Sequence, residues 1–168
     1  MDPKEIESSR DVLRESVPVG ANRIGPSPKP QSKILVIDDD PVTVKALTAV
    51  LNRKGYSVCS AINGSEAIRV VREENPDMLL VDVSLAPDPD YVDTVLWDGF
   101  QTTRWLRHIS AKKIPAIMMS ATDKAEYKKY AAMIGAETFL TKPLSDAILY
   151  RSIESALARP TPSGFASL

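Results

Sequence analysis

Short apolar runs alternate with segments of helical periodicity along the middle of the chain. Each run is three to six residues long, as expected for a buried strand. The runs cover residues 34–37, 56–61, 78–81, 114–119 and 138–140. Strands that alternate with helices pair in parallel, and the helices then cover both faces of the sheet. The pattern therefore predicts an α/β fold with a doubly wound, five-stranded parallel sheet.

Apolar residues recur at the spacing of one helix face after each run. In the first of these segments, Pro41 suits an initial helical position. Val44, Leu47 and Leu51 then follow on one face, up to a stop near Gly55. Four further helices are predicted at about residues 65–75, 99–107, 127–134 and 144–157.

Proline positions separate this body from two flanking segments. Seven of the 13 prolines lie outside residues 33–157, where extended or irregular backbone is expected. We therefore predict a flexible leader and Pro-rich linker at 1–32, one domain at 33–157 and a tail at 158–168. Residues 4–17 allow a short amphipathic helix or a disordered leader. The leader is favoured because an isolated helix of this length is marginal in water.

Composition and charge exclude several functional classes. The 168 residues carry 21 basic and 22 acidic side chains, a net charge of −1 that does not suit a dedicated nucleic-acid binder. Cys59 is the only cysteine and the chain has one histidine, so neither an internal disulfide nor a Cys/His zinc site is expected. The sequence contains neither a membrane-length apolar run nor a hydrophobic signal core. We therefore expect a cytoplasmic protein that makes no membrane contact.

Polar residues gather at the carboxyl ends of the predicted strands, where ligands bind in open α/β sheets. The residues that follow the first, third, fourth and fifth runs are Asp38 to Asp40, Asp82, Ser120, and Thr141 with Lys142. Each feature alone has a structural explanation, since Asp40 is also placed to cap the helix that starts at Pro41. Their joint occurrence at four strand ends favours a functional site.

A divalent cation would relieve the repulsion among these acids. If the strand order is 2-1-3-4-5, the first and third strands are neighbours about 4.8 Å apart, and Asp39 and Asp82 can share a cation. Lys142 would start about 10 Å away, a gap that its long side chain can largely span. Oxygen ligands favour a hard ion, and Mg²⁺, which retains several waters, fits best.

Five segments of the chain together resemble the receiver domain of two-component response regulators. They are KILVIDDDP at 33–41, MLLVD at 78–82, DGF at 98–100, IPAIMMSA at 114–121 and FLTKP at 139–143. The resemblance covers residues 33–157 and implies a flavodoxin-like (βα)5 sandwich with strand order 2-1-3-4-5. It implies a phosphoprotein that carries an aspartyl phosphate and signals by conformational change. Such a domain is not an enzyme beyond catalysing its own phosphotransfer and dephosphorylation.

The resemblance implies a role for each acidic residue of the site. Asp82 would be the phosphoacceptor and one of the ligands of Mg²⁺. Asp39 would bind the metal directly, Asp38 directly or through water, and the backbone carbonyl of Ser84 would complete the protein ligands. Attack by a carboxylate on phosphohistidine needs neutralised charge and alignment more than it needs proton transfer.

The resemblance also implies a switch. Ser120 would be the hydroxyl that turns toward the phosphoryl group, and Lys142 would pair with that group. Phe139 occupies the position of the aromatic rotamer switch. The Lys142–Pro143 peptide bond would be cis, as is usual in the family.

The partners implied by the resemblance are a histidine kinase or a histidine phosphotransfer protein as phosphodonor. A downstream protein would bind the surface of the fourth and fifth helices, and a homodimer is possible. Direct binding to nucleic acid or membrane is not expected. Eleven residues after Leu157 are too few for a DNA-binding output domain, so we expect a stand-alone receiver or one excised from a larger regulator.

The sequence departs from the family pattern in two places. Ala86 stands where a proline is usual, four residues after the acceptor. Residues 87–97 then add about nine residues to the connection before Asp98, which is long for a loop of this kind. This insertion carries apolar and acidic residues and would act as a lid that packs beside the site, or would be a solvated loop without that role.

Two other classes of function remain open from the residues alone. The pattern Asp38-x-Asp40 after an apolar strand also resembles the nucleophile motif of haloacid-dehalogenase phosphatases, in which Asp38 would carry the phosphate. That interpretation leaves Asp82 without a role. A receiver-like interaction module that never takes phosphate is the third possibility, although its acids and lysine would then have no function.

Overall fold

Ten elements alternate between strand and helix in the computed structural model, which describes residues 32–86 and 98–158. The strands are β1 (Lys33–Ile37), β2 (Ser57–Ala61), β3 (Met78–Asp82), β4 (Ala116–Ser120) and β5 (Thr138–Thr141). The helices are α1 (Pro41–Arg53), α2 (Gly64–Glu74), α3 (Gly99–Ile109), α4 (Ala125–Met133) and α5 (Asp146–Ala158). The predicted leader up to residue 31, the insertion at 87–97 and the tail at 159–168 lie outside the described residues.

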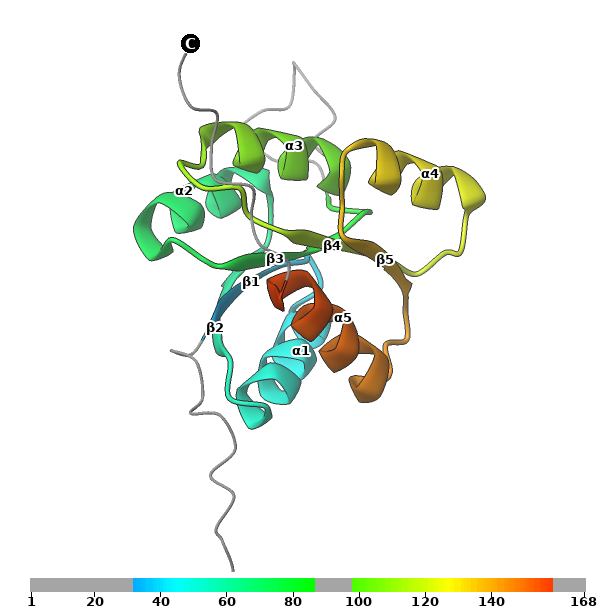
Figure 1. The fold of residues 1–168 in the computed structure, drawn as a ribbon, viewed down its shortest axis with the longest axis horizontal. Helices are drawn as coiled ribbons and strands as arrows, with labels where there is room; N and C mark the ends of the chain where they lie inside the picture. Colours follow the sequence, from blue (N-terminus) through cyan, green and yellow to red (C-terminus); the bar gives the residue numbers. More distant parts are fainter. Residues whose placement is uncertain (1–31, 87–97, 159–168) are drawn as a thin grey trace, which may run out of the picture.

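The strands form one parallel sheet in the order β2-β1-β3-β4-β5, which confirms the predicted topology. Helices α1 and α5 cover one face of this sheet, and α2, α3 and α4 cover the other (Figure 1). Because all strands run in the same direction, their carboxyl ends meet at one edge. The register pairs Ile37 of β1 with Val81 of β3, so the residues that follow both strands start side by side.

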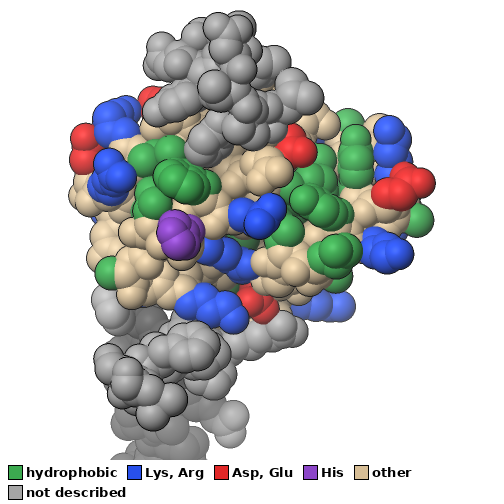
Figure 2. Space-filling view, turned by 90° about the horizontal axis from the view of Figure 1, so that it is seen from above, with side chains coloured by type: hydrophobic (Ala, Val, Ile, Leu, Met, Phe, Trp, Pro, Cys, Tyr) green, Lys and Arg blue, Asp and Glu red, His purple; other side chains and the backbone are tan. Residues whose placement is uncertain are grey.

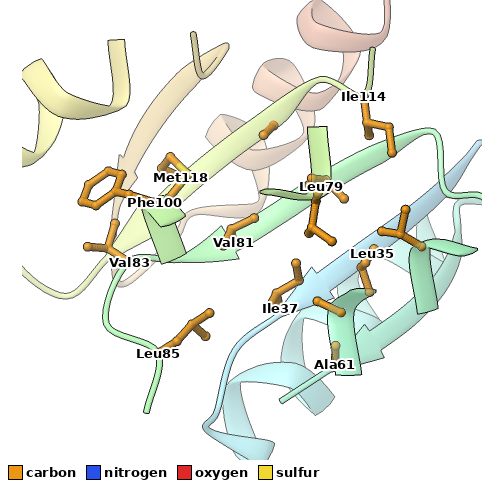
Figure 3. Packing of buried hydrophobic residues seen from close by; sticks show 14 of the residues in the cluster. Leu35, Ile37, Ala61, Leu79, Val81, Val83, Leu85, Phe100, Ile114 and Met118 are labelled. Carbon is orange, nitrogen blue, oxygen red and sulfur yellow. The ribbon is translucent and has the colours of Figure 1, made fainter. Parts of the chain in front are cut away.

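Two apolar clusters, one on each face, hold the layers together. Alternate residues of a strand point to opposite faces, so Leu35 and Ile37 pack with the first cluster, and Ile34 and Val36 with the second. Figure 3 shows side chains of the first cluster on the face of the sheet that α2, α3 and α4 cover. Every residue of β3 and β4 is buried, which explains why these strands read as continuous apolar runs.

Side-chain caps set where the first three helices begin. The carboxylate of Asp40 accepts hydrogen bonds from the N–H groups of Val42 (3.0 Å) and Thr43 (3.2 Å), which confirms its predicted role as the cap of α1. Asn63 and Asp98 cap α2 and α3 in the same manner. These caps fix the direction in which each helix leaves the functional edge of the sheet.

The element ends differ slightly from the pattern in the sequence. β4 begins at Ala116 rather than at residue 114, because Pro115 has no N–H for the ladder and contributes only its carbonyl, to Leu79 (2.9 Å). α5 continues to Ala158, one residue into the predicted tail. No helix within the described ranges has the length and apolar character needed to cross a bilayer.

Gly99 allows α3 to begin in direct contact with the end of β3. A Cβ atom at this position would lie 1.9 Å from the carbonyl oxygen of Asp82, which is far too close for any side chain. The N–H of Gly99 also donates to the carbonyl of Val83 (3.0 Å). Gly99 therefore helps to hold the backbone that carries Asp82.

Candidate functional site

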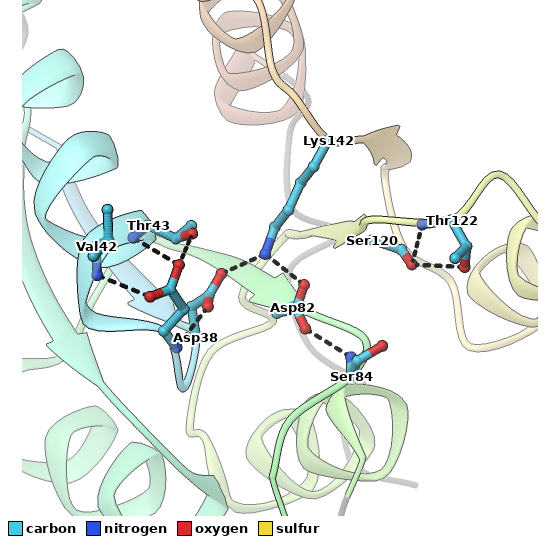
Figure 4. A network of polar contacts seen from close by, with 9 residues as sticks. Asp38, Val42, Thr43, Asp82, Ser84, Ser120, Thr122 and Lys142 are labelled. Carbon is cyan, nitrogen blue, oxygen red and sulfur yellow. Dashed lines mark hydrogen bonds and ion pairs between the residues drawn. The ribbon is translucent and has the colours of Figure 1, made fainter.

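Residues from three strand ends meet at the carboxyl edge of the sheet. Asp38 follows β1, Asp82 is the last residue of β3, and Lys142 follows β5. The Lys142 ammonium nitrogen lies 2.7 Å from Asp38 Oδ2 and 2.7 Å from Asp82 Oδ1 (Figure 4). The lysine crosses the width of β4 to reach both acids, as its predicted reach required.

Both carboxylates of this cluster are withdrawn from solvent. Asp38 is 1% exposed and Asp82 is 5% exposed. Burial raises the pKa of Asp38 above its usual value, and the hydrogen bond from Lys142 only partly opposes this effect. Burial acts to lower the pKa of Lys142, but the two carboxylates outweigh it and hold that pKa above the ordinary lysine value. Two acids thus face one base, and the buried cluster lacks one positive charge.

Backbone N–H groups fix the second oxygen of each carboxylate. Asp38 Oδ1 accepts from the N–H of Asp40 (3.0 Å), and Asp82 Oδ2 accepts from the N–H of Ser84 (2.8 Å). These short-range contacts were not predicted. The signal for them is that Asp side chains commonly accept from the backbone two residues further on. Both carboxylates therefore have fixed orientations before any ligand arrives.

Asp39 differs from its two acidic neighbours. Its side chain is exposed and makes no hydrogen bond or ion pair with the described residues. The structure thus brings Asp38, rather than Asp39, into contact with Lys142 beside Asp82. Asp39 is left as an open carboxylate next to the cluster.

The donor set suits a hard cation. Asp38 and Asp82 already turn oxygens toward one positive group, the Lys142 ammonium. Asp39 adds a carboxylate without a partner among the described residues. Over the same described part of the chain, no three His, Cys, Asp or Glu side chains surround a common metal position. The carboxylates therefore fit Mg²⁺ as an ion that takes few protein ligands and keeps water on the others.

Ser120 is buried one strand beyond Asp82, but its hydroxyl is paired with the β4–α4 connection. Ser120 Oγ lies 3.3 Å from Thr122 Oγ1 and accepts from the N–H of Thr122 at 3.1 Å. Figure 4 shows this pair standing apart from Asp82 and Lys142. The predicted switch hydroxyl is therefore held by Thr122, a residue that the sequence analysis did not single out.

The cis peptide bond expected after Lys142 is present, and Phe139 lies on β5 before it. Phe139 is half-buried against the cluster that α4 covers, and the Lys142–Pro143 bond is cis. Thr141 donates to Asp123 Oδ1 (3.3 Å), and Lys128 forms an ion pair with the same carboxylate. The connection between β4 and α4 is thus tied to β5 near the site.

A 2-1-3-4-5 sheet with buried acids after β1 and β3 and a lysine after β5 defines the class of receiver-type signalling domains. The model of the response regulator receiver domain matches residues 34–154, and the chain belongs to this family. The haloacid-dehalogenase interpretation is therefore wrong. It had relied on the acid run after β1, and Asp38 in that run is bound to Lys142 and to the Asp40 N–H.

Curated relatives agree with this family. Protein PilH of Pseudomonas aeruginosa is 32% identical over 128 residues, which are 76% of this chain and 98% of PilH. Protein PilG of the same organism is 29% identical over 131 residues, 77% of this chain and 90% of PilG. The alkaline phosphatase synthesis regulator PhoP of Bacillus subtilis is 32% identical over 76% of this chain, but only 49% of PhoP is covered.

Solved structures show the same fold. A putative response regulator from Chloroflexus aurantiacus superposes with a TM-score of 0.67 at 29% identity, covering 77% of this chain and 99% of that one. A two-component response regulator from Clostridium difficile gives a TM-score of 0.66 at 28% identity, covering 77% and 98% of the two chains. The chain is therefore a receiver domain of the two-component response regulator type.

Proposed function

We propose that Asp82 is the phosphoacceptor and that it takes the phosphoryl group from a histidine kinase or a histidine phosphotransfer protein in the presence of Mg²⁺. The observation that carries this proposal is the Lys142 ammonium at 2.7 Å from Asp82, in a cluster with one more carboxylate than cations. Such a cluster attracts further positive charge. It also places the Lys142 ammonium beside the acceptor, where it can pair with the phosphoryl group after transfer.

In the transfer step, a carboxylate oxygen of Asp82 forms a bond to phosphorus while the bond from phosphorus to the donor imidazole nitrogen breaks. The electron pair of that bond stays on the imidazole, so Asp82 needs no general base. The N–H of Ser84 orients the carboxylate, and Lys142 neutralises negative charge on the transferred group. Asp38, Asp39, Asp82 and the Ser84 carbonyl would hold Mg²⁺, which supplies further charge neutralisation when bound.

Signalling would begin at the hydroxyl of Ser120. We expect it to leave Thr122 and to donate to the phosphoryl group on Asp82, because three phosphoryl oxygens are stronger acceptors than a threonine hydroxyl. The β4–α4 connection would then move, Phe139 would change its rotamer, and a cytoplasmic partner would read the surface of α4 and α5. The same surface would serve in a homodimer if one forms.

Acceptor identity can be tested with acetyl phosphate, borohydride trapping and peptide mass spectrometry. We expect a label on Asp82 that requires Mg²⁺, disappears in Asp82→Asn and persists in Asp77→Asn. Asp77 is a matched control because it lies at the opposite end of β3, far from the carboxyl edge. A label on Asp38 would contradict the assignment, and a protein that takes no label would favour an interaction module that never accepts phosphate.

A further inference from the structure

A cavity of about 520 Å³ lies between α3 and α4, away from the cluster around Asp82. Its lining combines two guanidinium groups with an apolar wall, and the residues are Arg104, Arg107, Tyr130, Met133 and Ile134. Figure 2 looks down on the α2–α3–α4 layer and shows hydrophobic and basic side chains side by side on this surface. Neither the phosphoryl chemistry nor the proposed α4–α5 output requires such a cavity.

Arg107 forms a positive floor beneath the cavity. Its Nε donates to the carbonyl of Ile114 (3.1 Å) and its Nη1 to the carbonyl of Ile134 (2.7 Å), so it ties α3 to the end of α4. Its Nη2 is buried and has no hydrogen-bond acceptor among the described residues. Burial lowers the pKa of Arg107, and nearby Glu137 acts in the opposite direction. The guanidinium nevertheless remains protonated, so it supplies a fixed positive charge beside the cavity.

Arg104 and the rim provide the groups that a ligand can touch. Arg104 is exposed, and its Nη1 makes only a long hydrogen bond of 3.5 Å to Gln101 Oε1 among the described residues, so its guanidinium can turn to a ligand with little loss. Met133 is 72% exposed at the end of α4, and Trp105 is 46% exposed beside Arg104 on α3. Arginine, tyrosine and a flexible methionine, all of which line the cavity, are typical of surfaces that bind peptides.

We propose that the α3–α4 cavity is a docking site for an acidic peptide segment of another protein, in which a carboxylate stands next to an apolar side chain. The carboxylate would bind Arg104 over the positive floor that Arg107 provides. The apolar side chain would cover Met133 and the wall formed by Tyr130 and Ile134. This arrangement satisfies both halves of the lining at once, whereas a bare anion would leave the apolar half in water.

The charge of the chain favours a peptide over nucleic acid. A nucleic-acid surface needs basic residues along a stripe and usually a basic domain, but this chain has a net charge of −1. The two arginines instead form one local spot, which suits one or two carboxylates. The site is also independent of phosphotransfer, because none of its lining residues contacts Asp38, Asp82 or Lys142 in the structure.

A titration followed by two-dimensional ¹H–¹⁵N NMR tests the proposal. The probe is the peptide acetyl-Ser-Glu-Leu-Phe-Asp-Ser amide, and its matched control carries Gln and Asn in place of Glu and Asp. At concentrations up to about 2 mM, the acidic peptide should shift amide signals of α3 and α4, and the neutral peptide should bind at least about tenfold more weakly.

Two variants separate the site from a general charge effect. Arg104→Glu should weaken binding of the acidic peptide about tenfold or more. Lys45→Glu makes the same charge change on an exposed position of α1, on the other face of the sheet, and should leave the affinity within about twofold. Arg107 is kept because it holds two backbone carbonyls. Unchanged melting temperatures would verify that both variants are folded.

Other outcomes would overturn the proposal. Equal binding of the neutral peptide would show that the carboxylates are not recognised. The same signals shifted equally well by inorganic phosphate alone would identify a small-anion site. Shifts of α3 and α4 that grow with protein concentration in the absence of peptide would identify this surface as an interface between two copies of the chain.

Discussion

Replacing Lys142 with methionine tests how its charge balances those of the buried Asp38 and Asp82 carboxylates. The variant Lys142→Met keeps most of the side-chain volume but removes the ammonium that contacts Asp38 and Asp82, each at 2.7 Å. The side chain of Lys142 is 22% exposed, and those of Asp38 and Asp82 are 1% and 7% exposed, so water can compensate little. Two buried carboxylates would then face each other without a cation.

The expected loss is about 3 kcal/mol of unfolding free energy at pH 7.5 in the absence of divalent cations. Removing one partner of a buried ion pair typically costs about 3–5 kcal/mol. Repulsion between the two remaining carboxylates acts in the same direction. Burial already raises the pKa of Asp38, so proton uptake by this carboxylate can relieve part of the repulsion, and we expect a loss at the lower end of the range.

Urea unfolding in EDTA, followed by circular dichroism, measures this loss. Lys128→Met is the matched control because Lys128 pairs with Asp123 at an exposed position, where such a pair contributes at most about 1 kcal/mol. Adding Asp38→Asn to Lys142→Met should recover part of the loss, because the repulsion disappears. A loss below about 1 kcal/mol for Lys142→Met, or no recovery in the double variant, would refute a role for Lys142 in balancing the two carboxylates.

Three further predictions follow from the same edge of the sheet and its opposite end. Asp39→Ala should abolish Mg²⁺ binding as measured by titration calorimetry. Its melting temperature should be unchanged or raised, because Asp39 is exposed and has no partner among the described residues, and a large drop in melting temperature would contradict this. Gly99→Ala should lower the unfolding free energy in urea by about 2–3 kcal/mol, because its Cβ would lie 1.9 Å from the Asp82 carbonyl oxygen. The control Gly55→Ala has no atom within 4 Å of its Cβ and should lower it by only about 1 kcal/mol, from the strain of a positive φ. The pKa of Asp77 lies below its usual value because hydrogen bonds from the Lys33 N–H and Lys112 outweigh its burial. The wild-type protein should therefore have a larger unfolding free energy than Asp77→Asn. This difference should reach its full value above the pKa of Asp77 in the unfolded chain and should decrease as the pH falls through its pKa in the folded protein. A difference that stays constant in acid would argue against this assignment.

The order of the elements could be predicted from local pattern alone. The apolar runs that became β3 and β4 are buried on both faces, and only a sheet covered by helices on both sides explains such runs. The cap at Asp40 was equally local, since its carboxylate reaches N–H groups two and three residues away. Features of this kind depend on neighbours in the chain, which the sequence displays directly.

The site could be predicted in its members but not in its contacts. Asp82 and Lys142 were expected near each other because parallel strands end at one edge, but which carboxylate would share the lysine was not visible in the sequence. Asp38 and Asp39 are adjacent in the chain, and the backbone turns one side chain inward and the other outward. That choice depends on the path between β1 and α1, which packing against the rest of the fold determines.

Long-range partners were decided by the tertiary structure alone. Arg107 reaches carbonyls at residues 114 and 134 because α3 and α4 lie side by side over the sheet. The sequence by itself determined two things: the alternation of strands and helices, and the placement of the acids, the hydroxyl and the lysine at the strand ends. Hydrophobic periodicity is enough for the first, and the common direction of parallel strands is enough for the second. The tertiary structure decided which of these groups touch, because contacts between distant segments depend on how close-packed layers set the orientation of each side chain.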